Sequence, residues 1–123
     1  MTTPANSSPG YAERPDHKVE VRHYGGTVRA VYDGQVIAET SNALELREAS
    51  YPPVYYVPAA DVRLDLAQRS DAVTYCPFKG EASYWRFGAA DDIAWGYETP
   101  YDEVAEIAGH IAFYPNKVAV SAG

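Results

Sequence analysis

The sequence contains one cysteine, Cys76, among 123 residues. A lone thiol forms no disulfide within the chain, which is typical of proteins from a reducing compartment. A tetrahedral zinc site needs about four nitrogen or sulfur ligands, and beside Cys76 the sequence offers only His17, His23 and His110. We therefore expect no metal and no cofactor, and we expect packing alone to hold the domain together.

Long hydrophobic runs and basic clusters are also missing. No apolar run approaches the roughly 18 residues of a membrane-spanning helix, and Met1–Gly10 has neither the basic nor the apolar part of a signal peptide. The 10 lysines and arginines are scattered, and the net charge of −7 repels a phosphate backbone on average. The sequence thus favours a cytoplasmic protein that binds neither nucleic acid nor membranes.

Composition and length point to one globular domain. Hydrophobic residues make up 46% of the chain and charged residues 22%, values that are ordinary for a domain with its own core. Residues 1–16 are rich in proline, serine, threonine and glycine, so we expect a disordered tail there. Residues 17–121 are expected to form the single domain.

Short alternating segments predict many β-strands. Asp33-Gly34 lies between two such segments and predicts a tight hairpin, because a type I′ turn needs positive φ at both central residues. Gly25-Gly26 is interpreted as another hairpin turn, in preference to a phosphate-binding turn. The expected strands are 18–22, 27–32, 35–40, 43–47, 54–57, 72–75, 82–87, 92–97, 110–114 and 117–120.

A single helix is expected late in the chain. Thr99 and Pro100 suit its N-terminus, and Gly109 suits its end. The pattern as a whole predicts a mainly β fold, a compact antiparallel β sandwich or barrel-like domain with one short helix near the C-terminus. The apolar residues at the spacing of one helix face are Val104, Ile107, Ala108 and Ile111.

Four motifs follow one another in a distinctive order. They are Glu48–Val62 (EASYPPVYYVPAADV), Cys76–Trp85 (CPFKGEASYW), Ala94–Tyr97 (AWGY) and Ala108–Pro115 (AGHIAFYP). These stretches resemble the domain-of-unknown-function 427 family, and the resemblance runs from about residue 17 to residue 120. It implies a compact fold of the β-tent type and soluble bacterial, sometimes fungal, proteins. The family carries a nucleotidyltransferase-like label.

Charged residues embedded in these apolar motifs are the first candidates for a site. They form either buried ion pairs, such as Lys79 with Glu48, or the polar floor of a pocket. The set consists of Glu48, Asp61, Arg63, Lys79 and Glu81. Cys76 lies three residues before Lys79, whose ammonium group would favour a thiolate, although a half-buried structural cysteine is the simpler interpretation.

Aromatic residues are the second set of candidates, because the chain has 11 tyrosines and 2 tryptophans. Adjacent strand residues point to opposite faces, so one of Tyr55 and Tyr56 belongs to the core and the other can line a concave face. We expect a ligand-binding site drawn from Glu48, Tyr55, Tyr56, Asp61, Arg63, Cys76, Lys79, Tyr84, Trp95 and His110.

The leading hypothesis is a small-molecule-binding domain with an aromatic cleft. The first alternative is an enzyme, either nucleotidyltransferase-like or a hydrolase that uses His110 and an acid. The chain has no P-loop motif, and its close acid pairs are Asp61 with Asp65 and Asp91 with Asp92. The second alternative is a protein-interaction module that pairs through a sheet edge near Pro52-Pro53. Catalytic residues, ligand and oligomeric state stay open, a homodimer included.

Overall fold

The computed structural model describes residues 9–10, 18–88 and 92–123. The expected tail, apart from Pro9 and Gly10, and the acid Asp91 therefore lie outside the described residues. The strands and 3₁₀ helices (η) are β1 (Val19–His23), β2 (Val28–Tyr32), β3 (Gln35–Thr40), β4 (Leu44–Glu48), β5 (Val54–Pro58), η1 (Ala59–Asp61), η2 (Leu64–Leu66), β6 (Gln68–Cys76), β7 (Gly80–Arg86), β8 (Ala94–Tyr97), η3 (Asp102–Ile107), β9 (His110–Phe113) and β10 (Ala119–Ala122).

The strands form two antiparallel sheets, which confirms a mainly β fold. One sheet has seven strands in the order β1-β4-β5-β9-β8-β7-β6, and the other has three in the order β10-β2-β3. The seven-stranded sheet ends at β1 on one side and at β6 on the other, so it does not close into a barrel. The barrel-like alternative is therefore wrong, and the β-tent assignment stays a prediction.

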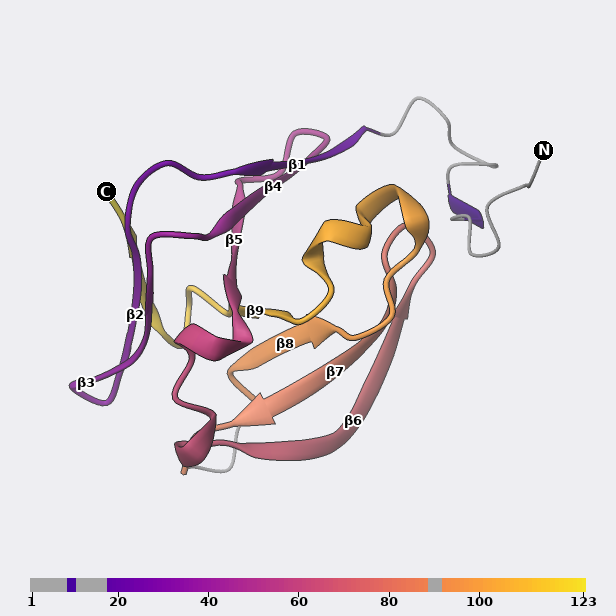
Figure 1. Cartoon of the computed structure of the whole chain (residues 1–123). Coiled ribbons are helices and arrows are strands. Elements are labelled where there is room, and N and C mark those ends of the chain that lie inside the picture. Colours follow the sequence, from indigo (N-terminus) through magenta and orange to yellow (C-terminus); the bar gives the residue numbers. More distant parts are fainter. Residues whose placement is uncertain (1–8, 11–17, 89–91) are drawn as a thin grey trace.

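Strand β9 joins two arms of the seven-stranded sheet. Its first residues pair with β5 (Val57↔Ile111), and its later residues pair with β8 (Trp95↔Ala112). We call β1, β4 and β5 the first arm, and β6, β7 and β8 the second arm. Figure 1 shows that the two arms run in different directions on either side of β9. The sheet thus turns at β9, and one of its faces lies on the inside of that turn.

The element η3 corrects the expected helix. Its residues form a 3₁₀ helix with a kink at Val104 (φ −129°, ψ 30°), and neither Thr99 nor any other side chain caps it. The reason is tertiary: the Tyr101 N–H donates to the carbonyl of Lys79 in the β6–β7 turn, which holds Tyr101 in an extended conformation. Val104 and Ile107 are buried as the pattern predicts, whereas Ile111 belongs to β9.

Two hydrophobic cores hold these elements together. The first lies between the two sheets and contains Val28, Ile37, Val57 and Phe113 among others. The second lies inside the turn of the large sheet, where η3 fills the space between the arms (Figure 1). Its buried residues are Leu46 and Tyr56 from the first arm, Ala82 and Tyr97 from the second arm, Ala112 from β9, and Val104 and Ile107 from η3.

Turn chemistry is predicted correctly in one place and wrongly in another. Asp33 (φ 53°) and Gly34 (φ 76°) both adopt positive φ between β2 and β3, which confirms the tight hairpin. Gly25-Gly26 is not a hairpin turn, because β1 pairs with β4 while β2 lies in the other sheet. A Cβ at Gly26 would lie 1.9 Å from the carbonyl oxygen of Gly123, so this crossing between sheets requires a glycine.

The segment Pro52-Pro53 lies in no strand and precedes β5. The residues of β5 nearest to it, Val54–Tyr56, pair with β4, and the last two residues of β5 pair with β9. The edge strands of the two sheets are β1, β6, β10 and β3. Within the described part of the chain, no helix has the length and apolar character that crossing a membrane requires.

Replacing Ile107 by Ala tests whether η3 holds the arms together. Ile107 is fully buried in the second core, so the substitution should cost about 2–5 kcal/mol of unfolding free energy. Glu106→Ala is the matched control, because Glu106 is its exposed neighbour, and its cost should stay within about 0.5 kcal/mol. Urea denaturation measures both, and equal effects of the two substitutions would contradict a packing role for η3.

Candidate functional site

Several of the predicted site residues lie together on the inside of the sheet. Tyr84 pairs with Trp95 across β7 and β8, so both side chains lie on one face of the second arm. Tyr56, from the first arm, meets Trp95 edge to face with ring centroids 6.4 Å apart. We call the surface formed by Glu48, Tyr56, Cys76, Lys79, Tyr84 and Trp95 the inner face.

An ion pair between Glu48 and Lys79 connects the two arms on the inner face. Glu48 ends β4, Lys79 lies in the β6–β7 turn, and the Lys79 Nζ to Glu48 Oε1 distance is 2.5 Å. The Glu48 and Lys79 side chains are only 18% and 13% exposed. A pair this sheltered is screened little by solvent, and either charge would be costly without the other. The ion-pair alternative for these residues is thus what the structure shows.

The sequence around Lys79 explains why its ammonium group points inward. Gly80 has φ 115°, a conformation that favours glycine. The carbonyl of Lys79 accepts a hydrogen bond from the Tyr101 N–H at 3.0 Å, which fixes the turn against the start of η3. On the other side, the Gly10 N–H donates to the carbonyl of Pro77 at 2.9 Å. The turn is therefore held from both sides.

Aromatic residues form the wall of the inner face. The indole N–H of Trp95 donates to the Tyr56 hydroxyl. Trp95 also packs against Tyr114, with ring centroids 4.5 Å apart and the ring planes tilted by 39°. Tyr84 is hydrogen-bonded to Tyr114 and, at 2.8 Å, to the Thr74 hydroxyl. Trp95, Tyr84 and Tyr114 are only partly buried, so part of each side chain reaches the surface.

Burial keeps these phenols protonated. It raises the pKa of Tyr56 and of Tyr97 well above the usual value for tyrosine. Burial, followed by the hydrogen bond with Tyr84, raises the pKa of Tyr114 to about 12. Tyr56 and Tyr97 are buried in the second core, so of these three hydroxyls only that of the partly exposed Tyr114 is open to a ligand. Titratable groups with shifted pKa values gather here as they do at many functional sites.

Arg86 was missed by the sequence analysis. It lies two residues after Tyr84 on β7, so alternation places both on the same face. Its Nε atom is buried without a hydrogen-bond partner among the described residues. Buried polar atoms are paired in the great majority of cases, so this nitrogen is a donor that the described residues leave unused.

The remaining predicted site residues lie elsewhere. Tyr55 lies on the opposite face of β5 from Tyr56, where its ring meets Tyr24 at 5.0 Å. Arg63 is 53% exposed and pairs with Asp65 at 2.8 Å, away from Lys79's partner Glu48.

Asp61 and His110 line two separate hollows instead. Asp61 accepts a 2.6 Å hydrogen bond from the Thr40 hydroxyl and lines a polar hollow of about 350 Å³. The His110 ring is bonded through Nδ1 to the carbonyl of Ala108 at 3.0 Å and lines a hollow of about 160 Å³ beside Trp85. A third hollow, of about 250 Å³, lies near Tyr32 and contains none of the predicted residues.

The described residues contain no group of three or more His, Cys, Asp or Glu side chains that could hold a metal ion. The described acids of the two close pairs have other partners: Asp65 binds Arg63, and Asp92 accepts a 3.2 Å hydrogen bond from Ser70. What the inner face offers is a sheltered ion pair and a set of hydroxyl donors, an arrangement suited to binding a polar molecule by shape and hydrogen bonds.

Alkaline titration tests the burial of the phenols. An unfolded tyrosine ionises near pH 10, whereas the pKa of Tyr114 is raised to about 12. Between these values the unfolded chain loses protons first, so stability is complete below about pH 10 and falls as pH rises toward 12. Circular dichroism should show unfolding in this window together with a cooperative rise in phenolate absorbance. A structure that stays folded while all tyrosines ionise at their ordinary pKa would contradict the burial.

Comparison with known proteins identifies the family of this chain. A comparison with curated proteins finds no match. A family model described as Domain of unknown function (DUF427), with the short label NTP_transf_9, matches residues 20–122. The match covers both arms, β9 and every residue of the inner face. The chain therefore belongs to the DUF427 family.

Proposed function

We propose that this domain binds a small planar molecule with acceptor oxygens on the inner face. The observation that carries the proposal is the Glu48–Lys79 ion pair, which lies sheltered beside a wall of partly buried aromatic residues. Residues more than thirty positions apart in the sequence meet there, although a hydrophobic contact would join the arms with no desolvation cost. A polar contact in this position supports recognition rather than stability alone.

The chemistry of the wall supports the ligand class. Tyr84 and Tyr114 are partly buried and have hydroxyl groups, and Arg86 adds an Nε–H without a partner among the described residues. Donors of this kind fit carbonyl or carboxylate oxygens. The partly exposed Trp95 adds an apolar aromatic ring next to them, which suits a planar molecule.

A thermal-shift screen tests the proposal. Purified protein is incubated with a panel of carboxylate- and carbonyl-bearing ring compounds, with nucleotides and Mg²⁺ as a separate group. We expect a compound from the first group to raise the unfolding midpoint, because a ligand that binds only the folded state stabilises it by mass action. If only the Mg²⁺-nucleotide group shifts the midpoint, the nucleotidyltransferase-like alternative replaces the proposal.

Two variants locate the binding. Tyr84→Phe removes one hydroxyl donor and should weaken a hit by about 3- to 10-fold, and Lys79→Met removes the ammonium group and should weaken it by about 10-fold or more. Arg63→Met is the matched control, because it removes a cation that pairs with Asp65 on the exposed surface. Titration calorimetry compares the four proteins. No hit for the wild type, or equal affinity in all variants, would overturn the proposal.

A further inference from the structure

A second hollow lies outside the inner face, at the point where β8 and β9 separate. The two strands pair at Trp95↔Ala112, but the next residue of β9, Ile111, pairs with Val57 of β5 instead. Gly96 faces the gap, and a Cβ on it would lie 2.6 Å from the carbonyl oxygen of His110. The backbones of β8 and β9 thus approach too closely at Gly96 for any side chain, and a hollow lined by Gly96, His110 and Ile111 lies beside this contact.

This β8–β9 pocket has the size and walls of a site for one small ring. Its volume is about 160 Å³, and Leu64, Trp85 and Ile111 are among the residues that line it. A cavity of about 150 Å³ lined by aliphatic and aromatic side chains holds one benzene molecule. The pocket therefore accommodates a single six-membered ring or a short branched alkyl group.

The charged group that lines the pocket is a carboxylate. Glu98 accepts a hydrogen bond from the Ser83 hydroxyl at 2.9 Å and forms an ion pair with Arg69, and both contacts fall on Oε1. A carboxylate has two oxygens and about four acceptor positions, so it can accept further hydrogen bonds beside these two contacts. The Glu98 side chain is 53% exposed, which makes it accessible to a molecule that enters from solvent.

His110 is the second polar side chain that lines the pocket, and its neutral ring also has a hydrogen-bond acceptor. His110 lies next to the carbonyl of Ala108 through Nδ1, at 3.0 Å, and a carbonyl can only accept. Nδ1 therefore carries the proton, which leaves Nε2 of a neutral ring with a lone pair. Glu98 and a neutral His110 are thus both hydrogen-bond acceptors, which favours a ligand that carries a donor. The net charge of −7 attracts cations to the protein.

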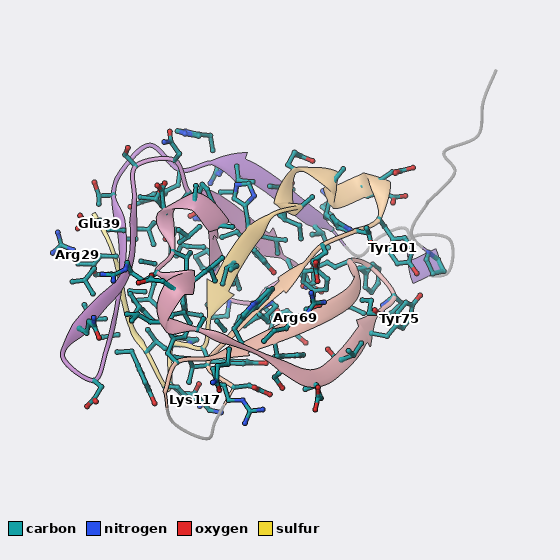
Figure 2. All side chains as sticks on the ribbon, turned by 60° about the horizontal axis from the view of Figure 1, so that its bottom comes forward. Arg29, Glu39, Arg69, Tyr75, Tyr101 and Lys117 are labelled. Atoms are coloured by element: carbon teal, nitrogen blue, oxygen red, sulfur yellow. The ribbon has the colours of Figure 1, made fainter. Side chains whose placement is uncertain are left out.

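We propose that the β8–β9 pocket binds an aryl or short alkyl ammonium compound, with its apolar part against Trp85, Leu64 and Ile111 and its ammonium group on Glu98. Arg69, labelled in Figure 2, already places a cation at this surface, because its guanidinium lies 5.9 Å from the centre of the Trp85 ring and pairs with Glu98, so an ammonium ligand would share Glu98 with it. Trp85 and Tyr84 are neighbours on β7 and point to opposite faces. The pocket is thus independent of the inner face, and either proposal can fail without the other.

Three ring compounds of similar size but different charge test whether the β8–β9 pocket prefers a cation. Benzylamine, which is protonated at neutral pH, is compared with benzyl alcohol and with benzoate by titration monitored by NMR. We expect benzylamine to bind at least 5-fold more tightly than benzyl alcohol and benzoate to bind most weakly. Signals of Trp85 and Gly96 should shift, and those of Tyr84 should not. Benzoate binding as tightly as benzylamine, or no binding of any probe, would overturn the proposal.

Substitutions assign the interaction to Glu98. Glu98→Gln should bring the affinity for benzylamine down to that for benzyl alcohol, whereas Glu81→Gln, an exposed acid on β7, should leave the difference unchanged. Leu64→Phe fills the apolar end and should abolish binding of both probes. Leu64 is 36% exposed, so this variant should still fold. Equal loss of benzylamine binding in Glu98→Gln and Glu81→Gln would reduce the effect to general charge and contradict the assignment.

Discussion

The Glu48–Lys79 ion pair is the contact on which the arrangement of this domain depends. The large sheet turns at β9, and its arms are continuous only through that four-residue strand. Away from β9 the arms are joined by the packing of η3 and by this polar contact. Hydrophobic packing is tolerant of small displacements, whereas a sheltered ion pair requires both groups at a defined separation. The pair therefore sets the position of one arm relative to the other.

The rest of the inner face follows from that position. Tyr56 belongs to the first arm and Trp95 to the second, so their edge-to-face contact and the hydrogen bond between them require the arms to meet at one angle. The Lys79 turn also holds η3 through the Tyr101 N–H. Loss of the ion pair would thus displace both the aromatic residues of the inner face and η3. A ligand on the inner face would contact groups from both arms.

Much of the fold was predictable because it depends on neighbours in the sequence. The alternation of polar and apolar residues predicted the strands, and Asp33-Gly34 predicted a hairpin turn with positive φ at both residues. The pairing of β1 with β4 was not predictable, because the Gly25-Gly26 crossing is recognised only by its contact with Gly123. Likewise the 3₁₀ form of η3 depends on a hydrogen bond to Lys79, far away in the sequence.

The same distinction applies to the candidate site. Alternation correctly required Tyr55 and Tyr56 to lie on opposite faces, but it could not say which faces inward. Tyr56 does so because Leu44, its register partner, lies in the same core. Arg63 is excluded from the inner face by a local partner, Asp65, which no pattern of apolar residues reveals. Arg86 gave no signal in the sequence, since its buried nitrogen is a property of the fold.

A double-mutant cycle on Glu48 and Lys79 tests the central claim most directly. Glu48→Gln, Lys79→Met and the double variant are compared with the wild type by urea denaturation, and the coupling energy is the difference between the double change and the sum of the single changes. The account predicts a coupling of about 1–3 kcal/mol, the range for hydrogen bonds to charged groups in sheltered positions. A coupling within about 0.3 kcal/mol of zero would show that packing alone positions the arms, and would contradict the account.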